Sequence, residues 1–176
     1  MANVYYNKKA EYSYKLYKDN KYFRKARAIV VDKSGMLCLI QVTFKDDRKT
    51  HYLLPGGGVD DGESSKQAAV REAFEEFGVK TKIKKYIDKN YYKVPMKFED
   101  NDFISRRVEY YYLCEIIEED ENAEFGVDGE FSKEDREYKK VKLSLEDIEK
   151  INHEDLNSMQ KRTYDKLIEI LKQNKK

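Results

Sequence analysis

The sequence predicts an α/β fold in which a mixed β-sheet lies between layers of helices. The first observation is the order of the patterns: strand-like runs, one amphipathic helix, more strands and then C-terminal helices, as in layered α/β domains. The second is composition, with 40% hydrophobic residues, 15 Tyr and 8 Phe, which suits a strand-rich globular fold. A chain of 176 residues can form one domain with a substantial core.

We expect a single domain over residues 1–176, with an N-terminal arm at 1–23, a core at 24–143 and C-terminal helices at 144–176. In the arm, Tyr12, Tyr14 and Leu16 alternate, which favours a strand-like segment. Such an arm can add edge structure, shape a substrate pocket or pair with a second subunit, so a homodimer stays open.

The core begins with apolar runs at 26–32 and 36–44 around Lys33-Ser34-Gly35, which predicts a β-hairpin. Residues 80–94 predict one or two strands ending at Pro95, followed by a charged loop at 96–103. Residues 106–117 predict a strong strand, and 118–137 an acidic surface loop.

At the C-terminal end, Val141 and Leu143 predict a last short strand, and Ser144 is the expected cap of a helix. A second helix is expected from about residue 156 to residue 171. Its apolar positions recur at helical spacing and form one packing stripe: Tyr164, Leu167, Ile168 and Leu171.

The central helix has clear end signals. Ser64 and Gln67 are spaced as a capping box, and Gly78 suits a left-handed C-cap. An apolar stripe predicts the face turned toward the core: Ala69, Val70, Ala73, Phe74 and Phe77.

Glu72, Glu75 and Glu76 are spaced three and four residues apart and should cluster on one side of this helix. A divalent cation would relieve their repulsion, and oxygen ligands suit Mg²⁺ or Mn²⁺ better than Zn²⁺. Arg71 lies four residues before Glu75 and can orient it by a charge-assisted hydrogen bond.

The loop before the helix contains Gly56, Gly57 and Gly58, whose backbone can turn sharply and approach a ligand closely. Such a loop can also offer a carbonyl oxygen to a metal ion. Glu63 stands just outside the helix N-terminus, where it can accept hydrogen bonds from loop amides and favours the positive end of the helix dipole.

Residues 57–79 resemble the Nudix box, G-x5-E-x7-R-E-U-x-E-E-x-G-U, where U is aliphatic. The matching positions are Gly57, Glu63, Arg71, Glu72, Glu75, Glu76, Gly78 and Val79. Ala73 departs from the pattern because a larger aliphatic residue is usual there. The resemblance implies a Nudix-type α/β/α sandwich over about residues 24–171 and hydrolysis of a nucleoside diphosphate linked to another moiety.

On this resemblance, the catalytic residues are Glu72, Glu75 and Arg71. The metal site comprises Gly57, Glu72, Glu75 and Glu76, and Glu63 and Gly78 are structural. The general base is Glu72 or Glu75, although some family members use an acid from a distant loop, here Glu134 or Glu137.

For substrate binding we expect Gly56 and Gly57 together with Arg27 or Arg48, while Lys45 and Lys49 are alternatives. Pro95 lies where a marker of ADP-ribose-cleaving members is found, but nucleoside triphosphates, dinucleoside polyphosphates, nucleotide sugars and capped RNA stay open. A catalytically silent domain that senses nucleotides is the alternative function.

Lys+Arg 35 and Asp+Glu 34 nearly cancel, which argues against nucleic acid as a partner. The resemblance implies a small nucleotide as the substrate. Apolar runs are too short for a membrane span. Cys38 and Cys114 are expected to be free, buried thiols of a cytoplasmic protein, and neither His51 nor His153 is expected to be catalytic.

Overall fold

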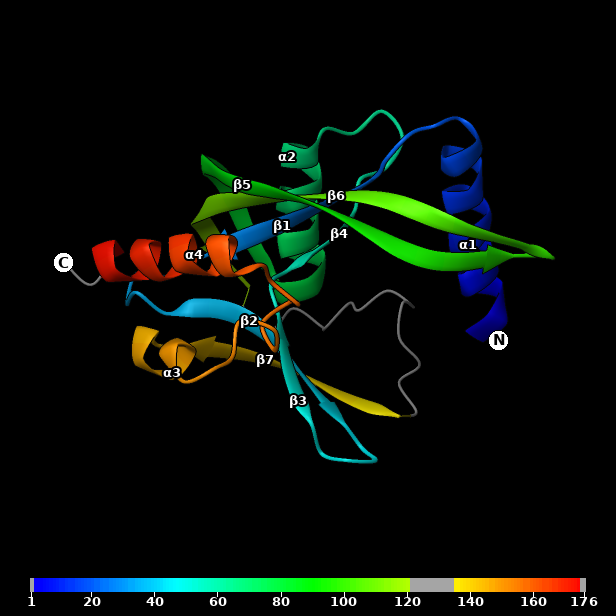
Figure 1. Ribbon diagram of the computed structural model, residues 1–176. Helices are drawn as coiled ribbons and strands as arrows, with labels where there is room; N and C mark the ends of the chain where they lie inside the picture. The colour runs from blue at the N-terminus through cyan, green and yellow to red at the C-terminus, as the bar shows by residue number, and fades with distance from the viewer. Residues whose placement is uncertain (1, 121–134, 175–176) are drawn as a thin grey trace.

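The computed structural model describes residues 2–120 and 135–174 (Figure 1). Its elements in chain order are α1 (Ala2–Lys18), β1 (Phe23–Val30), β2 (Leu37–Phe44), β3 (Thr50–Leu53), β4 (Gly56–Gly58), α2 (Ser65–Glu72), the π-helical turn η1 (Ala73–Phe77), β5 (Val79–Phe98), β6 (Asn101–Glu119), β7 (Arg136–Leu143), α3 (Leu145–Glu149) and α4 (Lys161–Asn174).

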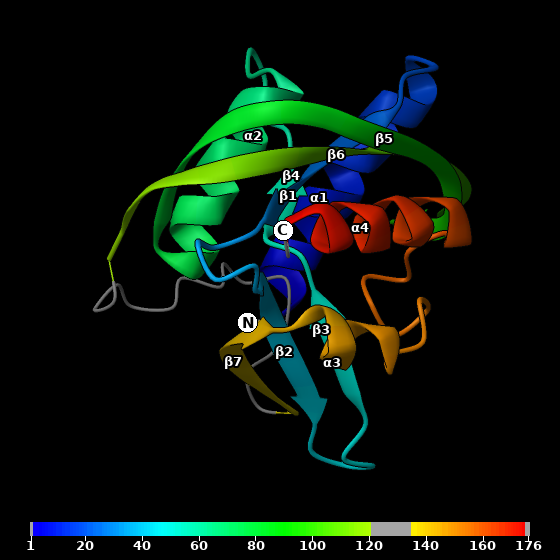
Figure 2. The same ribbon diagram turned by 90° about the vertical axis from the view of Figure 1, so that its left-hand side faces the viewer.

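Within the described residues, the strands form a four-stranded sheet, β4-β1-β6-β5, and a three-stranded sheet, β3-β2-β7. The larger sheet is mixed, because β1 runs parallel to β6 and antiparallel to β4. One core cluster lies under α2 and the other under α4, and these helices lie on opposite sides of the strands (Figure 2). The predicted α/β layering is confirmed.

The predicted hairpin of residues 26–32 and 36–44 is wrong, because β1 and β2 belong to different sheets. A turn does join them, closed by a single bridge between Val31 and Leu37. Beyond it the strands diverge, since both edges of β1 are already paired with β4 and β6.

The N-terminal arm is a helix, α1, and not the expected strand. Its tyrosines follow helical spacing: the Tyr14 ring lies 5.2 Å from that of Phe103, and the Tyr17 ring 5.4 Å from it. The local alternation of Tyr12, Tyr14 and Leu16 is overridden because the helix places the Tyr14 and Tyr17 rings against the β5–β6 hairpin.

The β5–β6 hairpin is longer than predicted. Pro95 does not end the strand, and residues 96–103 are not a loop, since β5 runs on to Phe98 and turns directly into β6. Pro95 is tolerated because β5 is an edge strand, so the missing N–H costs no ladder hydrogen bond on the open side. The strong strand predicted at 106–117 is confirmed within β6.

At the C-terminal end, the cap at Ser144 is confirmed, since its hydroxyl accepts from the Asp147 amide. α4 begins at Lys161 rather than near residue 156. Leu156 instead lies in a turn that bridges Tyr52. Of the predicted stripe, Leu167 and Leu171 are fully buried and Tyr164 and Ile168 pack partly against them.

Both cysteines, Cys38 and Cys114, are free and buried, as expected, and burial raises the pKa of each thiol to about 12. In the two described ranges, no helix is long and apolar enough to cross a bilayer.

A polar clamp joins the start of α4 to β5. Arg162 donates from Nε and Nη2 to the two carboxylate oxygens of Asp88, at 3.0 and 2.9 Å. The Thr163 hydroxyl also donates to Asp88, at 2.9 Å. Burial of Asp88 acts to raise its pKa, but these hydrogen bonds outweigh it and the net pKa is lowered.

Asp88→Asn should therefore destabilise the protein by about 1–3 kcal/mol at neutral pH. Because the folded-state pKa lies below the unfolded value of about 3.9, the stabilisation is present above that value and is lost as pH falls through the folded pKa. Urea unfolding from pH 7 down to about 3 should show the gap between wild type and variant closing in acid. The control is Asp165→Asn, which removes an exposed α4 ion pair with Lys161; an equal loss there would refute the prediction.

Candidate active site

The helix carrying the acidic residues is built as its end signals predict. The Ser64 hydroxyl accepts from the Gln67 amide at 3.1 Å, and the Gln67 side chain accepts from the Ser64 amide at 2.9 Å. The helix ends at Gly78, with φ 78° in the left-handed region. Its buried face packs against β1 and β6: Ala68, Ala69, Ala73 and Phe77.

The second half of the helix is a π turn, η1, which the sequence pattern did not reveal. Phe74, expected in the apolar stripe, is 46% exposed. A π turn takes in one more residue than an α turn, so the side chains that follow Glu72 are rotated from their α-helical directions. π turns of this kind are frequent at functional sites.

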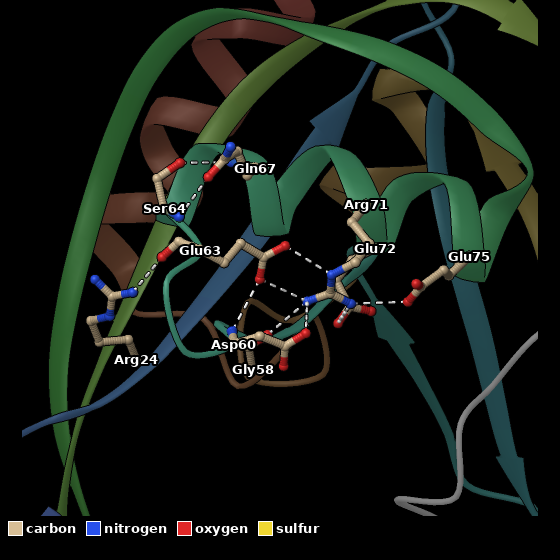
Figure 3. Close-up of polar contacts among 9 residues, drawn as sticks. All are labelled: Arg24, Gly58, Asp60, Glu63, Ser64, Gln67, Arg71, Glu72 and Glu75. Carbon is tan, nitrogen blue, oxygen red and sulfur yellow. Dashed lines mark hydrogen bonds and ion pairs between the residues drawn. The ribbon is translucent and has the colours of Figure 1, made fainter.

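Arg71 is the centre of the acidic cluster (Figure 3). Its Nη1 donates to Glu72 Oε1 and to Glu75 Oε2, each at 2.9 Å. Its Nε donates to Glu63 Oε1 at 2.9 Å, and its Nη2 to the Gly58 carbonyl at 3.0 Å. One guanidinium therefore holds two carboxylates of this helix and also the loop that precedes it.

Glu63 connects this guanidinium to the loop. Its second oxygen accepts from the Asp60 amide at 3.0 Å. The hydrogen bond from Arg71 is the main cause of a lowered pKa at Glu63, so this carboxylate is a charged acceptor and not a proton carrier. Its backbone carbonyl accepts from Arg24 at 2.8 Å. These contacts support the structural role expected of Glu63.

Glu76 and Glu72 lie against the glycine loop. Glu76 Oε2 accepts from the Gly56 amide at 2.9 Å. A Cβ added at Gly57 would lie 2.4 Å from Glu72 Oε1, so the absence of a side chain lets this carboxylate lie against the backbone. Burial raises the pKa of Glu72, partly offset by Arg71.

The donor set has the chemistry of a magnesium or manganese site, with carboxylate oxygens and the loop backbone and no sulfur or imidazole. Within residues 2–120 and 135–174, no three His, Cys, Asp or Glu side chains are already grouped to hold a metal ion. Arg71 instead pairs with Glu72 and Glu75. The Glu75 side chain is 43% exposed, against 13% for that of Glu72.

The two arginines expected at the substrate lie in different surroundings. Arg27 is buried; its Nε bonds Glu109 Oε1 at 2.5 Å and its Nη1 donates to the Gly56 carbonyl at 3.0 Å. It therefore supports the glycine loop from beneath. Arg48 lies in the β2–β3 turn with its side chain 66% exposed, 3.7 Å from Glu137.

Of the two acids expected in a distant loop, Glu134 lies outside the described residues. Glu137 is exposed on β7 and registers with Thr43, whereas its neighbour Arg136 registers with Phe44 and lines a cavity. Since successive strand residues face opposite sides, Glu137 points away from that cavity.

This cavity, of about 470 Å³, lies between the two sheets and was not anticipated from the sequence. Arg27, Glu109 and Tyr111 line one side. On the other, the Arg136 guanidinium lies 4.6 Å from the Phe44 ring centroid, and Phe44 meets His51 edge to face at 5.5 Å. In the sequence, the cavity is signalled only by the alternation of apolar residues along β2. The strands that face β2 across the cavity are far from it in the chain, so no local pattern shows that they meet.

The fold and site together define a layered α/β domain that holds a helix-borne carboxylate cluster against a glycine loop. The NUDIX domain model matches residues 21–167, and the chain belongs to the Nudix family.

Three individual proteins are also similar to this chain. The RNA pyrophosphohydrolase of Wolbachia sp. subsp. Drosophila simulans (strain wRi) is 35% identical over 91 residues, which are 47% of this chain and 54% of that protein. The chain thus spans about half the length of this curated relative. A NUDIX hydrolase from Nitrosomonas europaea superposes with a TM-score of 0.57 at 14% identity, covering 89% of this chain and 92% of that one. A MutT protein from Methanosarcina mazei Go1 superposes at 0.52 and 19% identity, covering 88% and 96%.

The three consecutive glycines should respond differently to alanine. A Cβ at Gly56 would lie 2.2 Å from the Ala26 carbonyl, which is backbone, so Gly56→Ala should cost about 1–3 kcal/mol of stability. Gly57→Ala should displace the Glu72 side chain and lower activity with less effect on folding. Gly58→Ala is the control, since its nearest neighbour is the Phe23 ring at 3.7 Å. Thermal melts and turnover would check this; equal behaviour of all three variants would contradict it.

Proposed function

We propose that this protein is a metal-dependent Nudix pyrophosphohydrolase that cleaves a phosphoanhydride in a nucleoside diphosphate linked to another moiety. The observation that carries the proposal is the convergence of Glu72, Glu75 and Glu76 on Arg71 and the glycine loop. Nothing in a purely structural helix would require carboxylates to gather beside Gly56 and Gly57, which lack room for a side chain.

A divalent ion, which Nudix enzymes generally use, would neutralise the pyrophosphate and lower the pKa of a bound water. Glu72, Glu75, Glu76 and the Gly57 carbonyl would hold it, and Mg²⁺ or Mn²⁺ suits these oxygens. Arg71 then serves to place the carboxylates, because its guanidinium is already fixed by Glu63 and Gly58.

Glu72 is the best-supported general base among the described residues. Its side chain is 13% exposed, and burial raises its pKa, which makes it a better proton acceptor than an ordinary carboxylate at neutral pH. Glu75 is more exposed and remains the alternative.

The cavity between the sheets supplies the features of a nucleotide pocket. Its lining combines apolar and aromatic side chains, among them Val42, Phe44 and Tyr92, with a larger number of polar and charged ones, among them Lys25, Asn90 and Arg136. Pockets of this size with aromatic walls and convergent polar groups are typical ligand sites. It borders Arg27, which donates to the glycine loop, so a base in the cavity would leave its phosphates near the acidic cluster.

For the substrate, we favour the 5′-phosphorylated end of RNA over a free nucleotide. The 35% identity with an RNA pyrophosphohydrolase supports this choice. ADP-ribose receives less support, since Pro95 lies in the β5–β6 hairpin and does not line the cavity. We also propose that the enzyme is cytoplasmic. Light scattering would show whether it forms a homodimer.

The deciding experiment is a substrate panel with Mg²⁺ or Mn²⁺ and product identification. The panel holds 5′-triphosphorylated RNA, nucleoside triphosphates, ADP-ribose and dinucleoside polyphosphates. Release of phosphate or pyrophosphate from RNA, faster than from free nucleotides, is expected. Nucleotide binding without hydrolysis of any substrate, in either metal, would favour the silent sensor instead.

A further inference from the structure

We propose that the part of the larger sheet not covered by α2 binds single-stranded RNA. This surface, the aromatic platform, combines four tyrosines and five cations: Tyr22, Tyr86, Tyr91, Tyr110, Lys21, Arg24, Lys89, Lys93 and Arg106. It deepens the proposed function, because it would hold the RNA chain that follows the reacting 5′ end.

Strand register places these side chains on one face. Tyr91 pairs with Val108, Lys89 with Tyr110 and Lys93 with Arg106 across β5 and β6. Arg24 of β1 registers with Val108 on the other side. α2 covers only the neighbouring part of this face, where the Ser65 and Tyr112 hydroxyls meet at 2.6 Å. The rest of the face is left open beside α1.

The rings are exposed well beyond what a packing role requires. Tyr22 is 42% exposed, Tyr86 46% and Tyr91 52%. Tyr22 and Tyr91 meet edge to face at 5.3 Å. A hollow of about 530 Å³ opens beside them, lined by Tyr12, Lys21, Arg24 and Tyr110 among others. Exposed tyrosines lining a hollow can stack unpaired bases.

Cations are interleaved with these rings. The Arg106 guanidinium lies 5.0 Å from the Tyr22 ring centroid, and the Lys89 ammonium 5.4 Å from that of Tyr91. Among the residues that line the hollow, the acids are Asp60 and Asp61, and Asp61 accepts from the Tyr12 hydroxyl. The whole chain has a net charge near zero, but the platform carries a local excess of positive charge. Aromatic rings with interspersed cations are how proteins bind single-stranded nucleic acids.

The platform also adjoins the acidic cluster. Asp60 and Gly62 line its hollow and belong to the loop that ends in Glu63. The Glu63 carboxylate accepts a hydrogen bond from Arg71, and its backbone carbonyl accepts one from Arg24. The cavity and the platform lie on opposite faces of the larger sheet, since Arg27 and Tyr111 line the one and Arg24 and Tyr110 the other. From a nucleotide whose phosphates lie at the acidic cluster, the RNA chain would therefore pass over this loop to reach the platform.

The test measures binding alone, by fluorescence anisotropy of a short single-stranded RNA with a 5′-hydroxyl end and no metal. This probe has nothing to hydrolyse, so failure of the proposed function would not affect it. Tyr91→Ala should weaken binding about tenfold. Lys93→Ala should lower the slope of log K against log salt by about one.

The matched controls lie outside the platform. Tyr17→Ala removes a ring of similar exposure, 45% against 52% for Tyr91, that packs on Phe103. Lys172→Ala removes an exposed cation of α4. Circular dichroism checks the folding of each variant. The proposal is overturned if wild type does not bind RNA at low salt, if Tyr17→Ala weakens binding as much as Tyr91→Ala, or if a DNA strand of the same sequence binds more tightly.

Discussion

Glu75→Gln and Glu76→Gln should each lower turnover at least about a hundredfold, while leaving the fold intact. Glutamine keeps the size and hydrogen-bonding oxygen of glutamate but removes the negative charge that a divalent ion needs. For Glu76, the oxygen that accepts from the Gly56 amide is retained, so the loop should stay in place and the loss should be in catalysis.

Turnover at saturating Mg²⁺, with the preferred substrate of the panel, measures this effect. The control is Glu169→Gln on the exposed face of α4, which should leave turnover unchanged. Partial recovery at high Mn²⁺ would support a weakened metal site. Full activity in both variants would remove these carboxylates from the metal site.

Glu109→Gln should destabilise the fold by about 3–5 kcal/mol, or very roughly 10 °C in Tm. Both members of the Arg27–Glu109 pair are nearly fully buried, with side chains 11% and 8% exposed. Burial acts to raise the pKa of Glu109, but the Arg27 charge outweighs it and the net pKa is lowered. Neutralising the partner leaves the Arg27 charge in a poorly solvated site.

Chemical unfolding would measure this loss. The control is Glu118→Gln, which breaks the exposed 3.0 Å pair with Lys80 and should cost no more than about 0.5 kcal/mol. The double variant Arg27→Met with Glu109→Leu should regain most of the stability, since apolar replacements of a buried pair are often neutral. A Glu109→Gln loss as small as that of the control would contradict the buried-pair account.

How far the sequence predicts the structure depends on how local each signal is. The capping box at Ser64, the left-handed Gly78 and the Arg71–Glu75 contact were all predictable, because each is settled within one or two turns of chain. The α1 helix was not, because its tyrosine pattern acquires meaning only against Phe103, far along the chain. Pro95 was misread for the same reason, since nothing local tells an edge strand from an inner one.

The candidate site divides in the same way. Its residue types and spacings at 57–79 follow from the sequence, and so does the family. The sequence did not show that Arg27 lies beneath the glycine loop on Glu109, or that Arg48 stands apart in an exposed turn. Both depend on how β1 and β2 enter separate sheets.

The sequence by itself determined a helix with a fixed order of charges, because caps and periodicity act over a few residues. Only the tertiary structure decided how exposed each of those carboxylates is, which arginine supports the loop, and where the scattered cations gather. Those properties arise from pairing between distant strands, and strand pairing depends on contacts that no single stretch of the chain contains.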